Sequence, residues 1–303
     1  MKKFLISLGL AALFVGGTLF AGKTALHTVS DFANRENLEK TTLVQERVQE
    51  TISLLEDLSE DPYIRSKEHS YQEKAAYLTD KNQQENLGYM MLRILDEEIG
   101  VYREDAESSV SNLGSRDYMQ KLYKTGEVQV TDAFLAGADG KTINYTVAVA
   151  IEEDSRVTGA LFAAIYGEEI DGYLQDDRYA AHVLVGSQLQ YMGGVTNDRF
   201  GLSVAQVLEG EYKTSRPVEN ILLDFNDKKS GSFWSLESPL EYIVYSPVDG
   251  ADWVVMTQVR AIPLIQSILV TYGCGVAVLL ISGCLLLRGK NRGKEAKDIS
   301  SHI

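Results

Sequence analysis

The stretch SRDYMQKLYKTGEVQVTDAFLAGADGKTINYTVAVAIEEDSRVTGALFAAI, residues 115–165, contains one helix signal followed by three strand signals. The polar segment 116–123 predicts a short helix that ends at Gly126, because glycine readily adopts the backbone conformation that terminates a helix. Three runs rich in β-branched and aromatic residues then predict strands, separated by polar turn segments. The strands are expected at 128–135, 142–151 and 157–165, and the turns at 138–140 and 152–155.

The second of these strands alternates, with Ile143, Tyr145, Val147 and Val149 at every other position. Alternation of this kind is typical of a strand with one buried face and one open face. The stretch therefore predicts a helix followed by an antiparallel meander. One face of the sheet would be free to hold a ligand against the helix and its loops.

Regular elements are also expected on both sides of this stretch, and the region after it is expected to form a smaller α/β unit. The upstream elements are a helix at 70–86, broken at Gly88, and strands at 89–95 and 99–102 around a turn at 96–98. The downstream elements are a short connector at 168–174, strands at 182–189 and 190–195, helices at 202–209 and 219–225, and a hairpin that pairs 240–247 with 253–259.

The order of these motifs resembles the Cache family of extracytoplasmic sensory domains, in particular the double-Cache proteins. The motifs similar to the membrane-distal Cache module are Arg116-Asp117-Tyr118, Thr131-Asp132-Ala133-Phe134, Asp139-Gly140-Lys141, and Val157 with Gly159. Those similar to the membrane-proximal module are Lys229-Ser230-Gly231, residues 242–248 (YIVYSPV) and Asp252-Trp253. Each motif is short, so the resemblance rests on their order and on the flanking apolar segments.

Together with those apolar segments, the resemblance implies an α+β fold. It consists of a long N-terminal helix and two PAS-like antiparallel-sheet modules between two transmembrane helices. The expected parts are a transmembrane signal anchor at 1–23, an amphipathic stalk helix at 24–62, the membrane-distal Cache module at 63–170, the membrane-proximal Cache-like module at 171–261, a transmembrane helix at 262–287 and a basic cytoplasmic tail at 288–303.

Two apolar segments predict the membrane spans. Residues 4–21 follow Met-Lys-Lys, and Leu19 stands where cleavage after Ala21 needs a small residue, which favours an uncleaved anchor. The run 262–287 carries no charge and is followed at once by a basic segment. Basic residues at both ends predict that both termini are cytoplasmic and that the region between the spans lies outside the cell membrane. Only residues 288–303 follow the second span, so no catalytic output domain is expected.

The segment after the first span predicts a long helix, because it contains neither Gly nor Pro between positions 23 and 61. Within it, Val44, Val48, Ile52 and Leu55 fall on one helical face. This stripe is the seam of a homodimer or the face that covers the sheet of the sensor domain, and the resemblance to Cache receptors implies that both uses can coexist. A second copy of the chain is therefore an expected partner.

The composition argues against several classes of function. The formal net charge of −14 disfavours binding to nucleic acid. Cys274 and Cys284 lie in one apolar run about 15 Å apart along a helix, too far for an internal disulfide. The histidines are scattered, and the segment 137–142, superficially like a phosphate loop, joins two predicted strands and is better explained as a hairpin. We therefore predict no catalytic residue, no metal, no cofactor and no enzymatic activity.

Arg116 is the first candidate for ligand binding, because a guanidinium at the start of a helix facing a sheet can bind a carboxylate bidentately. An ion pair with a neighbouring Asp or Glu would account for the residue equally well. Tyr118 and Phe134 are expected either as aromatic walls of the site or as core residues, and Asp132 and Tyr145 as its polar edges. The expected ligand is a small polar or anionic extracellular molecule.

The amino-acid-binding branch of the double-Cache family provides a sharper test. Its pattern has an Arg followed by an aromatic pair, and then a Tyr-x-Asp whose Asp holds the amine of the ligand. In this sequence Arg116 and Tyr118 match, Met119 replaces the second aromatic residue, Phe134 stands at the Tyr, and Ala136 stands at the Asp. The missing amine anchor argues against an α-amino acid and leaves a carboxylate or another small polar metabolite.

Three functions fit these features. The first is a membrane-anchored sensor that transmits ligand binding to a cytoplasmic or membrane signalling partner. The second is the sensory half of a diguanylate cyclase or histidine kinase whose catalytic domain is missing or separately encoded. The third is a non-signalling envelope protein, either a scaffold or a solute-binding module. Resemblance at the level of the fold does not rank these three.

Overall fold

The computed structural model describes residues 2–96, 101–102, 111–136, 141–196 and 198–300, with side chains described within 14–95, 113–136, 141–196 and 198–282. The chain divides into two compact units. One unit comprises Met1–Phe32 and Arg260–Ile303, and the other comprises Ala33–Val259. The second unit contains two five-stranded antiparallel sheets, a short two-stranded sheet and all of the residues predicted to bind a ligand.

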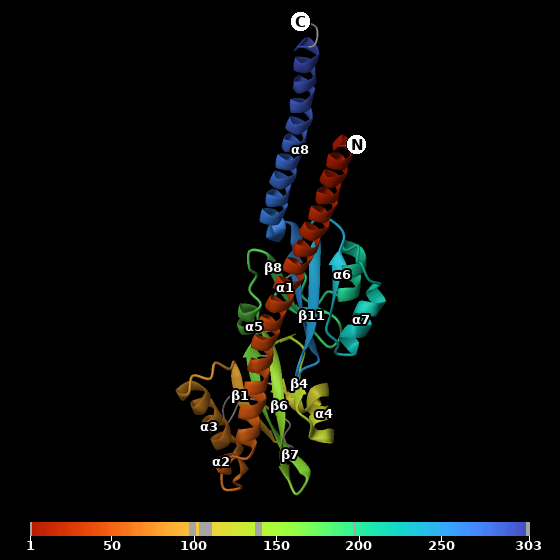
Figure 1. Cartoon of the computed structure of the whole chain (residues 1–303). Helices are drawn as coiled ribbons and strands as arrows, with labels where there is room; N and C mark the ends of the chain where they lie inside the picture. Colours follow the sequence, from red (N-terminus) through yellow and green to blue (C-terminus); the bar gives the residue numbers. More distant parts are fainter. Residues whose placement is uncertain (1, 97–100, 103–110, 137–140, 197, 301–303) are drawn as a thin grey trace. The chain divides into compact units, whose positions relative to one another are not determined.

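Helix α1 (Lys2–Ser59) is continuous through the segment that lacks Gly and Pro. The stripe formed by Val44, Val48, Ile52 and Leu55 is buried in one core that also contains strand residues of both sheets. The ribbon of α1 runs past the strands of both sheets (Figure 1). Of the two roles predicted for this stripe, it therefore has that of covering the sheets.

The first sheet is antiparallel, with the strand order β1-β7-β6-β4 and with β5 paired to β6. Helices precede it, and the predicted helix at 70–86 is confirmed as α3, which begins with a capping box between Ser70 and Glu73. The elements are α2 (Pro62–Arg65), α3 (Tyr71–Gln84), β1 (Met91–Asp96), β2 (Val101–Tyr102), β3 (Ser111–Asn112), the 3₁₀ turn Leu113–Ser115, α4 (Asp117–Thr125), β4 (Gln129–Val130), β5 (Phe134–Leu135), β6 (Ile143–Glu153) and β7 (Arg156–Tyr166).

The predicted end of the short helix and one predicted turn are confirmed. Helix α4 ends at Gly126, which has a φ of 73° and donates its N–H to the carbonyl of Leu122. Strands β6 and β7 are joined by Asp154 and Ser155, which have φ values of 50° and 60°. The turn predicted at 138–140 lies outside the described residues, as does most of the turn predicted at 96–98.

The strand predicted at 128–135 is divided into the two short strands β4 and β5. Thr131 still donates its N–H to Thr146, but the next residue, Asp132, uses its carboxylate to bind the second sheet. Because this residue is directed to another partner, the chain leaves the ladder between the two short strands. Propensity alone does not reveal such a tertiary contact.

The prediction that β6 has one open face is wrong. Tyr145, Val147 and Val149 belong to the core shared with α1, whereas Ala148 and Ala150, on the opposite face, belong to a core with Met119 and Leu122 of α4. Both faces of the strand are therefore covered, α1 on one and α4 on the other. The small side chains of the alanines allow α4 to approach the sheet closely.

The second sheet is also antiparallel, with the order β10-β11-β12-β8-β9. One of its faces packs on α1, and the other is covered by α6 and α7, which contribute Val204, Val207, Leu208, Ile221 and Phe225 to a separate core (Figure 1). The elements are α5 (Gly167–Tyr173), β8 (Ala180–Val185), β9 (Tyr191–Gly193), α6 (Val204–Glu211), α7 (Val218–Asn226), β10 (Gly231–Ser235), β11 (Glu241–Val248) and β12 (Trp253–Arg260).

The predicted hairpin and both predicted helices of this region are confirmed as β11, β12, α6 and α7, with three differences. The connector predicted at 168–174 is the helix α5. Strand β8 ends at Val185 rather than at 189, because the chain turns with Leu189 at a φ of 58°. Strand β10 was not predicted, since Gly and Ser weaken its strand signal and its pairing with β11 is a tertiary contact.

The other compact unit contains the first turns of α1 and the helix α8 (Ala261–Ser300). Within the described part of the chain, one segment is long and apolar enough to cross a membrane, Ala261–Ser282, with a mean hydropathy of 2.1. It agrees with the span predicted from 262 onward. The span predicted in the first residues of the chain stays a prediction.

Candidate ligand-binding site

Arg116 lies where the sequence placed it, at the start of α4. It is the residue before the first helical turn, has an extended backbone (φ −74°, ψ 140°) and an exposed side chain. Its guanidinium carbon lies 6.0 Å from the ring centre of Phe134, at the limit of a cation–π contact. Among the described residues no carboxylate forms an ion pair with Arg116.

Tyr118 lies next to Arg116 on α4 and is half-buried. Burial raises the pKa of its phenol to about 12, and the positive charge of Arg116 acts in the opposite direction. The phenol therefore stays protonated at neutral pH and remains a hydrogen-bond donor. Met119 and Leu122, both buried, anchor the helix on the sheet, so the orientation of Arg116 and Tyr118 follows from the packing of α4.

Phe134 lies on the face of the first sheet that α4 covers, and it places this face next to Arg116. It pairs with Asn144 across β5 and β6, and directly paired residues point to the same face of a sheet. Asn144 and Thr146 are buried polar residues two positions apart on this face. Asn144 Nδ2 donates to the carbonyl of Phe134 at 3.3 Å, and Thr146 Oγ1 lies 3.3 Å from Asn144 Oδ1.

Asp132 is not part of this group, although the sequence predicted it as a polar edge of the site. Its carboxylate accepts hydrogen bonds from the N–H of Ser187 at 2.9 Å, from Ser187 Oγ at 2.8 Å and from Gln190 Nε2 at 3.0 Å. A side chain at Gly186 would collide with this carboxylate, at 2.8 Å. Asp132 therefore holds the turn between β8 and β9 against the first sheet.

Tyr145 is also directed away from Arg116. It belongs to the core on the α1 side of β6, is fully buried, and donates its hydroxyl to the carbonyl of Met192 at 2.6 Å. Its ring contacts Trp253 edge-on, with the ring centres 5.1 Å apart. Burial raises the pKa of this phenol, so it acts as a neutral donor. The structure thus brings together Arg116, Tyr118 and Phe134, while Asp132 and Tyr145 join the two sheets.

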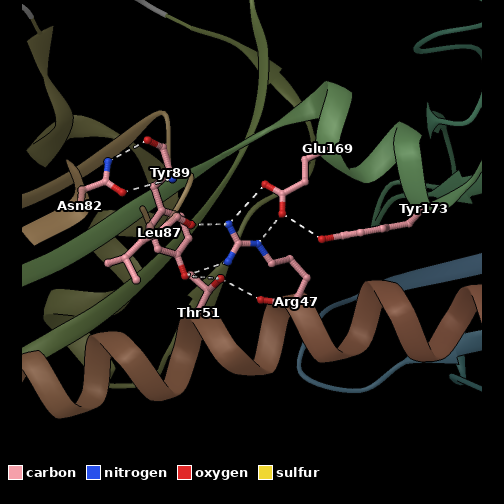
Figure 2. Close-up of polar contacts among 7 residues, drawn as sticks. All are labelled: Arg47, Thr51, Asn82, Leu87, Tyr89, Glu169 and Tyr173. Atoms are coloured by element: carbon pink, nitrogen blue, oxygen red, sulfur yellow. Dashed lines mark hydrogen bonds and ion pairs between the residues drawn. The ribbon is translucent and has the colours of Figure 1, made fainter. Parts of the chain in front are cut away.

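A polar cluster centred on Arg47 was not found from the sequence (Figure 2). Arg47, on α1, forms an ion pair with Glu169 of α5 in which Nε lies 2.7 Å from Oε1. It also donates to the hydroxyl of Tyr89 and to the carbonyl of Leu87, each at 3.2 Å. Its guanidinium lies over the Tyr89 ring, 4.4 Å from the ring centre.

The cluster is extended by further hydrogen bonds (Figure 2). Glu169 also accepts from the hydroxyl of Tyr173 at 2.9 Å, and Tyr89 bonds to Thr51, which lies one turn after Arg47 on α1. The side chains of Arg47 and Glu169 are only 11% and 27% exposed. The cluster connects three parts of the chain to one another: α1, the segment before β1, and α5, which follows the first sheet in the sequence. The sequence offers one signal for it, a charged residue beside the apolar stripe of a long helix.

Within the residues that the structure describes, no group of three or more His, Cys, Asp or Glu side chains is arranged to hold a metal ion. A pocket of about 490 Å³ lies elsewhere, between α2, α3 and the first sheet. Two of its basic residues already have carboxylate partners, since Arg65 pairs with Glu60 and Lys67 lies 3.0 Å from Glu153. Arg116 is therefore the better placed of these cations for binding an anion.

No family model and no curated protein matches the sequence, whereas solved structures are similar to the fold. The structure is similar to the ligand-binding domain of the Pseudomonas aeruginosa PAO1 amino acid chemoreceptor PctC in complex with GABA, with a TM-score of 0.58 and 11% identity over 76% of this chain and 98% of that one.

Two further solved structures are also similar to this chain over 98% of their own length. The ligand-binding domain of the Pseudomonas fluorescens chemoreceptor CtaA in complex with L-isoleucine has a TM-score of 0.60 and 10% identity over 81% of this chain and 98% of that one. The extracellular domain of soHK1S-Z6, assigned as a histidine kinase, has a TM-score of 0.61 and 12% identity over 80% and 98%. The chain thus has the Cache-type fold of extracellular sensor domains, as its motifs predicted.

Proposed function

We propose that this chain is a membrane-anchored extracytoplasmic sensor that binds a small polar or anionic molecule in its first module, the part of the chain that contains the first sheet. The observation that supports this most directly is the grouping of Arg116, Tyr118 and Phe134 beside the buried polar pair Asn144 and Thr146. This group offers a positive charge, a neutral hydroxyl donor and an aromatic surface on one side of the sheet. The fold supports the class of function, because the similar structures are ligand-binding domains.

We infer that the ligand is a small carboxylate. GABA and L-isoleucine, the ligands of two similar structures, both carry a carboxylate, and a guanidinium binds that group well. Both also carry an amine, for which the amino-acid-binding pattern uses an Asp at the position of Ala136. Ala136 is buried and has no charge. A carboxylate without an α-amino group therefore fits this chain better than an α-amino acid does.

The contacts between the two sheets support transmission of the binding event. Asp132 and Tyr145 connect the first sheet to Ser187 and Met192, and Arg47 connects α1 to α5. A ligand changes such a system only through its different affinities for two states of the protein. We propose that the ligand selects one packing of α1 against the two sheets, and that α1 and α8 carry this difference to the membrane.

We also propose a two-pass topology with both termini in the cytoplasm. The candidate span Ala261–Ser282 and the apolar residues 4–21 would cross the cell membrane, with basic residues on the cytoplasmic side of each. The stripe of α1 is buried, so a homodimer would form through other positions, of which Leu38 is 67% exposed. A cytoplasmic or membrane signalling partner would receive the signal.

The proposal is tested by screening the full chain in detergent for thermal stabilisation by small carboxylates, amines, nucleobases and sugars. A ligand at 100 times its dissociation constant stabilises the folded state by about 2.7 kcal/mol, enough to raise the melting temperature by several degrees. We expect a carboxylate to do so in the wild type and not in Arg116→Ala. The matched control is Lys124→Ala, which removes an exposed charge from the last turn of the same helix.

A response that survives Arg116→Ala would retain a sensor but reject this site. No response from a folded sample across the whole panel would reject ligand sensing of these classes and favour an envelope scaffold.

A further inference from the structure

The second module, the part of the chain that contains the second sheet, repeats the arrangement of elements that positions Arg116 in the first module. In both modules a nine-residue helix, α4 or α7, covers the sheet face opposite α1 and leads directly into an edge strand, β4 or β10. In both, an arginine stands at the start of that helix. Arg116 is the residue before α4, and Arg216 lies two residues before α7, ahead of Pro217. Topology therefore makes Arg216 the counterpart of Arg116.

The two arginines differ in what their guanidinium groups contact. Arg216 donates from Nη1 to the hydroxyl of Tyr245 at 2.8 Å and from Nη2 to Oδ2 of Asp224 at 2.8 Å. The hydroxyl of Tyr245 donates to the same carboxylate oxygen at 2.5 Å. Asp224 thus receives a guanidinium N–H and a phenol O–H at one oxygen, as a bound carboxylate would.

We propose that the second module contains a latent carboxylate-binding site, and that the side chain of Asp224 occupies it permanently as an internal ligand. The carboxylate comes from α7 itself, two turns after the arginine it binds, so no external molecule is needed to satisfy Arg216. The binding of external carboxylates is thereby restricted to the first module, where Arg116 has no carboxylate partner among the described residues.

Other features of the module support a preformed site rather than an incidental surface ion pair. Tyr245 is fully buried, and its ring is held edge-on by Phe225, with the ring centres 4.8 Å apart. Gly231 lies against the Tyr245 hydroxyl, and a side chain there would collide with that oxygen. The glycine of the Lys229-Ser230-Gly231 motif is thus required by the position of this hydroxyl. The side chains of Asp224 and Arg216 are 20% and 34% exposed, so a small solute can reach the place that Asp224 fills.

The ionisation of the three groups agrees with this arrangement. Hydrogen bonds from Tyr245 and Arg216 lower the pKa of Asp224, and the hydrogen bond to Asp224 raises the pKa of Arg216. The pKa of Tyr245 is raised by burial and by its bond to Asp224. Asp224 is therefore a carboxylate and Tyr245 a neutral donor at neutral pH, the charge states in which the three groups fit one another.

The proposal is tested by chemical rescue in the full chain. Asp224→Ala removes the internal carboxylate and leaves space beside Arg216 and Tyr245. We expect it to lower the melting temperature, and we expect formate or acetate at millimolar concentration to restore it along a saturable curve. Chloride at the same ionic strength is the salt control. Asp227→Ala is the matched variant, because Asp227 is an exposed carboxylate that pairs with Lys229 at the end of the same helix.

Saturable rescue of Asp224→Ala that is absent from Asp227→Ala and from the double variant Arg216→Ala/Asp224→Ala supports the latent site. Equal responses of all variants to formate and chloride would overturn it. If Asp224→Ala does not fold, Asp224→Ser leaves similar space and keeps a hydroxyl, and the same comparison decides. Rescue that persists in an Arg116→Ala background shows that the result is independent of the site proposed in the first module.

Discussion

His182 is a titratable residue buried inside the second unit, between α1 and the second sheet. Its Nδ1 lies 3.1 Å from Thr257 Oγ1, which lies 3.2 Å from Nδ2 of Asn37 on α1. Its Nε2 is buried and has no hydrogen-bond partner among the described residues. Burial, reinforced by Lys40, lowers the pKa of the imidazole to about 4 against the attraction of Asp176, Asp177 and Glu39.

This histidine predicts an acid-sensitive stability. Between about pH 6.5 and pH 4 the unfolded chain binds a proton at His182 that the folded chain does not, so the free energy of unfolding decreases as the pH falls through this window. The contribution approaches about 3 kcal/mol near pH 4. His182→Gln should remove this part of the slope in urea titrations of the full chain at several pH values. An unchanged slope in the variant would show that His182 does not titrate in this window.

At the scale of elements, the Arg47 cluster joins α1 to α5. Arg47 and Glu169 are both largely buried, and removal of one member of such a pair leaves the other without a partner in a site of low polarity. We therefore expect Arg47→Met to lower the free energy of unfolding by about 2 to 4 kcal/mol. Arg47→Lys keeps the charge but loses the planar set of donors, so we expect an intermediate loss.

The double variant Arg47→Met/Glu169→Met tests the coupling between these helices. Because it removes both charges, its stability should exceed that expected from the two single variants added together. Denaturant titrations of the four proteins give the coupling free energy. Additive losses would mean that the ion pair is not what joins α1 to α5.

At the scale of the whole molecule, the two sheets are parts of one packed unit. Tyr145 of the first sheet contacts Trp253 and Met192 of the second, and all three belong to the core that α1 covers. Asp132 adds a polar contact to the turn after β8. A change in the first module therefore reaches the second through direct packing as well as through α1.

The Asp132 contact can be tested by hydrogen exchange. Asp132→Ala leaves the N–H of Ser187 and the amide of Gln190 without their acceptor, which should lower the free energy of local opening of this turn by about 1 to 3 kcal/mol. Faster exchange should be confined to the segment around 186–190. Glu237→Ala removes an exposed carboxylate from the same module and serves as the control. Equal protection of Ser187 in the two variants would contradict the role assigned to Asp132.

Local sequence signals were sufficient to predict those features that depend only on residues close together in the chain. The end of α4 at Gly126, the start of α3 after Ser70 and the turn at Asp154 and Ser155 depend on backbone conformations and hydrogen bonds between near neighbours. Arg116 at the start of α4 could be placed for the same reason. The stripe of α1 could also be read, because its helical period is a property of the segment itself.

The sequence by itself determined the class of fold and the position of one charged residue, whereas only the tertiary structure decided what each candidate contacts. Tyr145 alternates correctly on its strand, but its face packs on α1 and the second sheet, and Asp132 binds residues far along the chain. The same difference separates Arg116 from Arg216. Both stand at the start of a helix, and among the described residues a carboxylate partner is found only for Arg216, where Asp224 of α7 reaches back to its arginine. Such contacts depend on long-range packing, which no local pattern encodes.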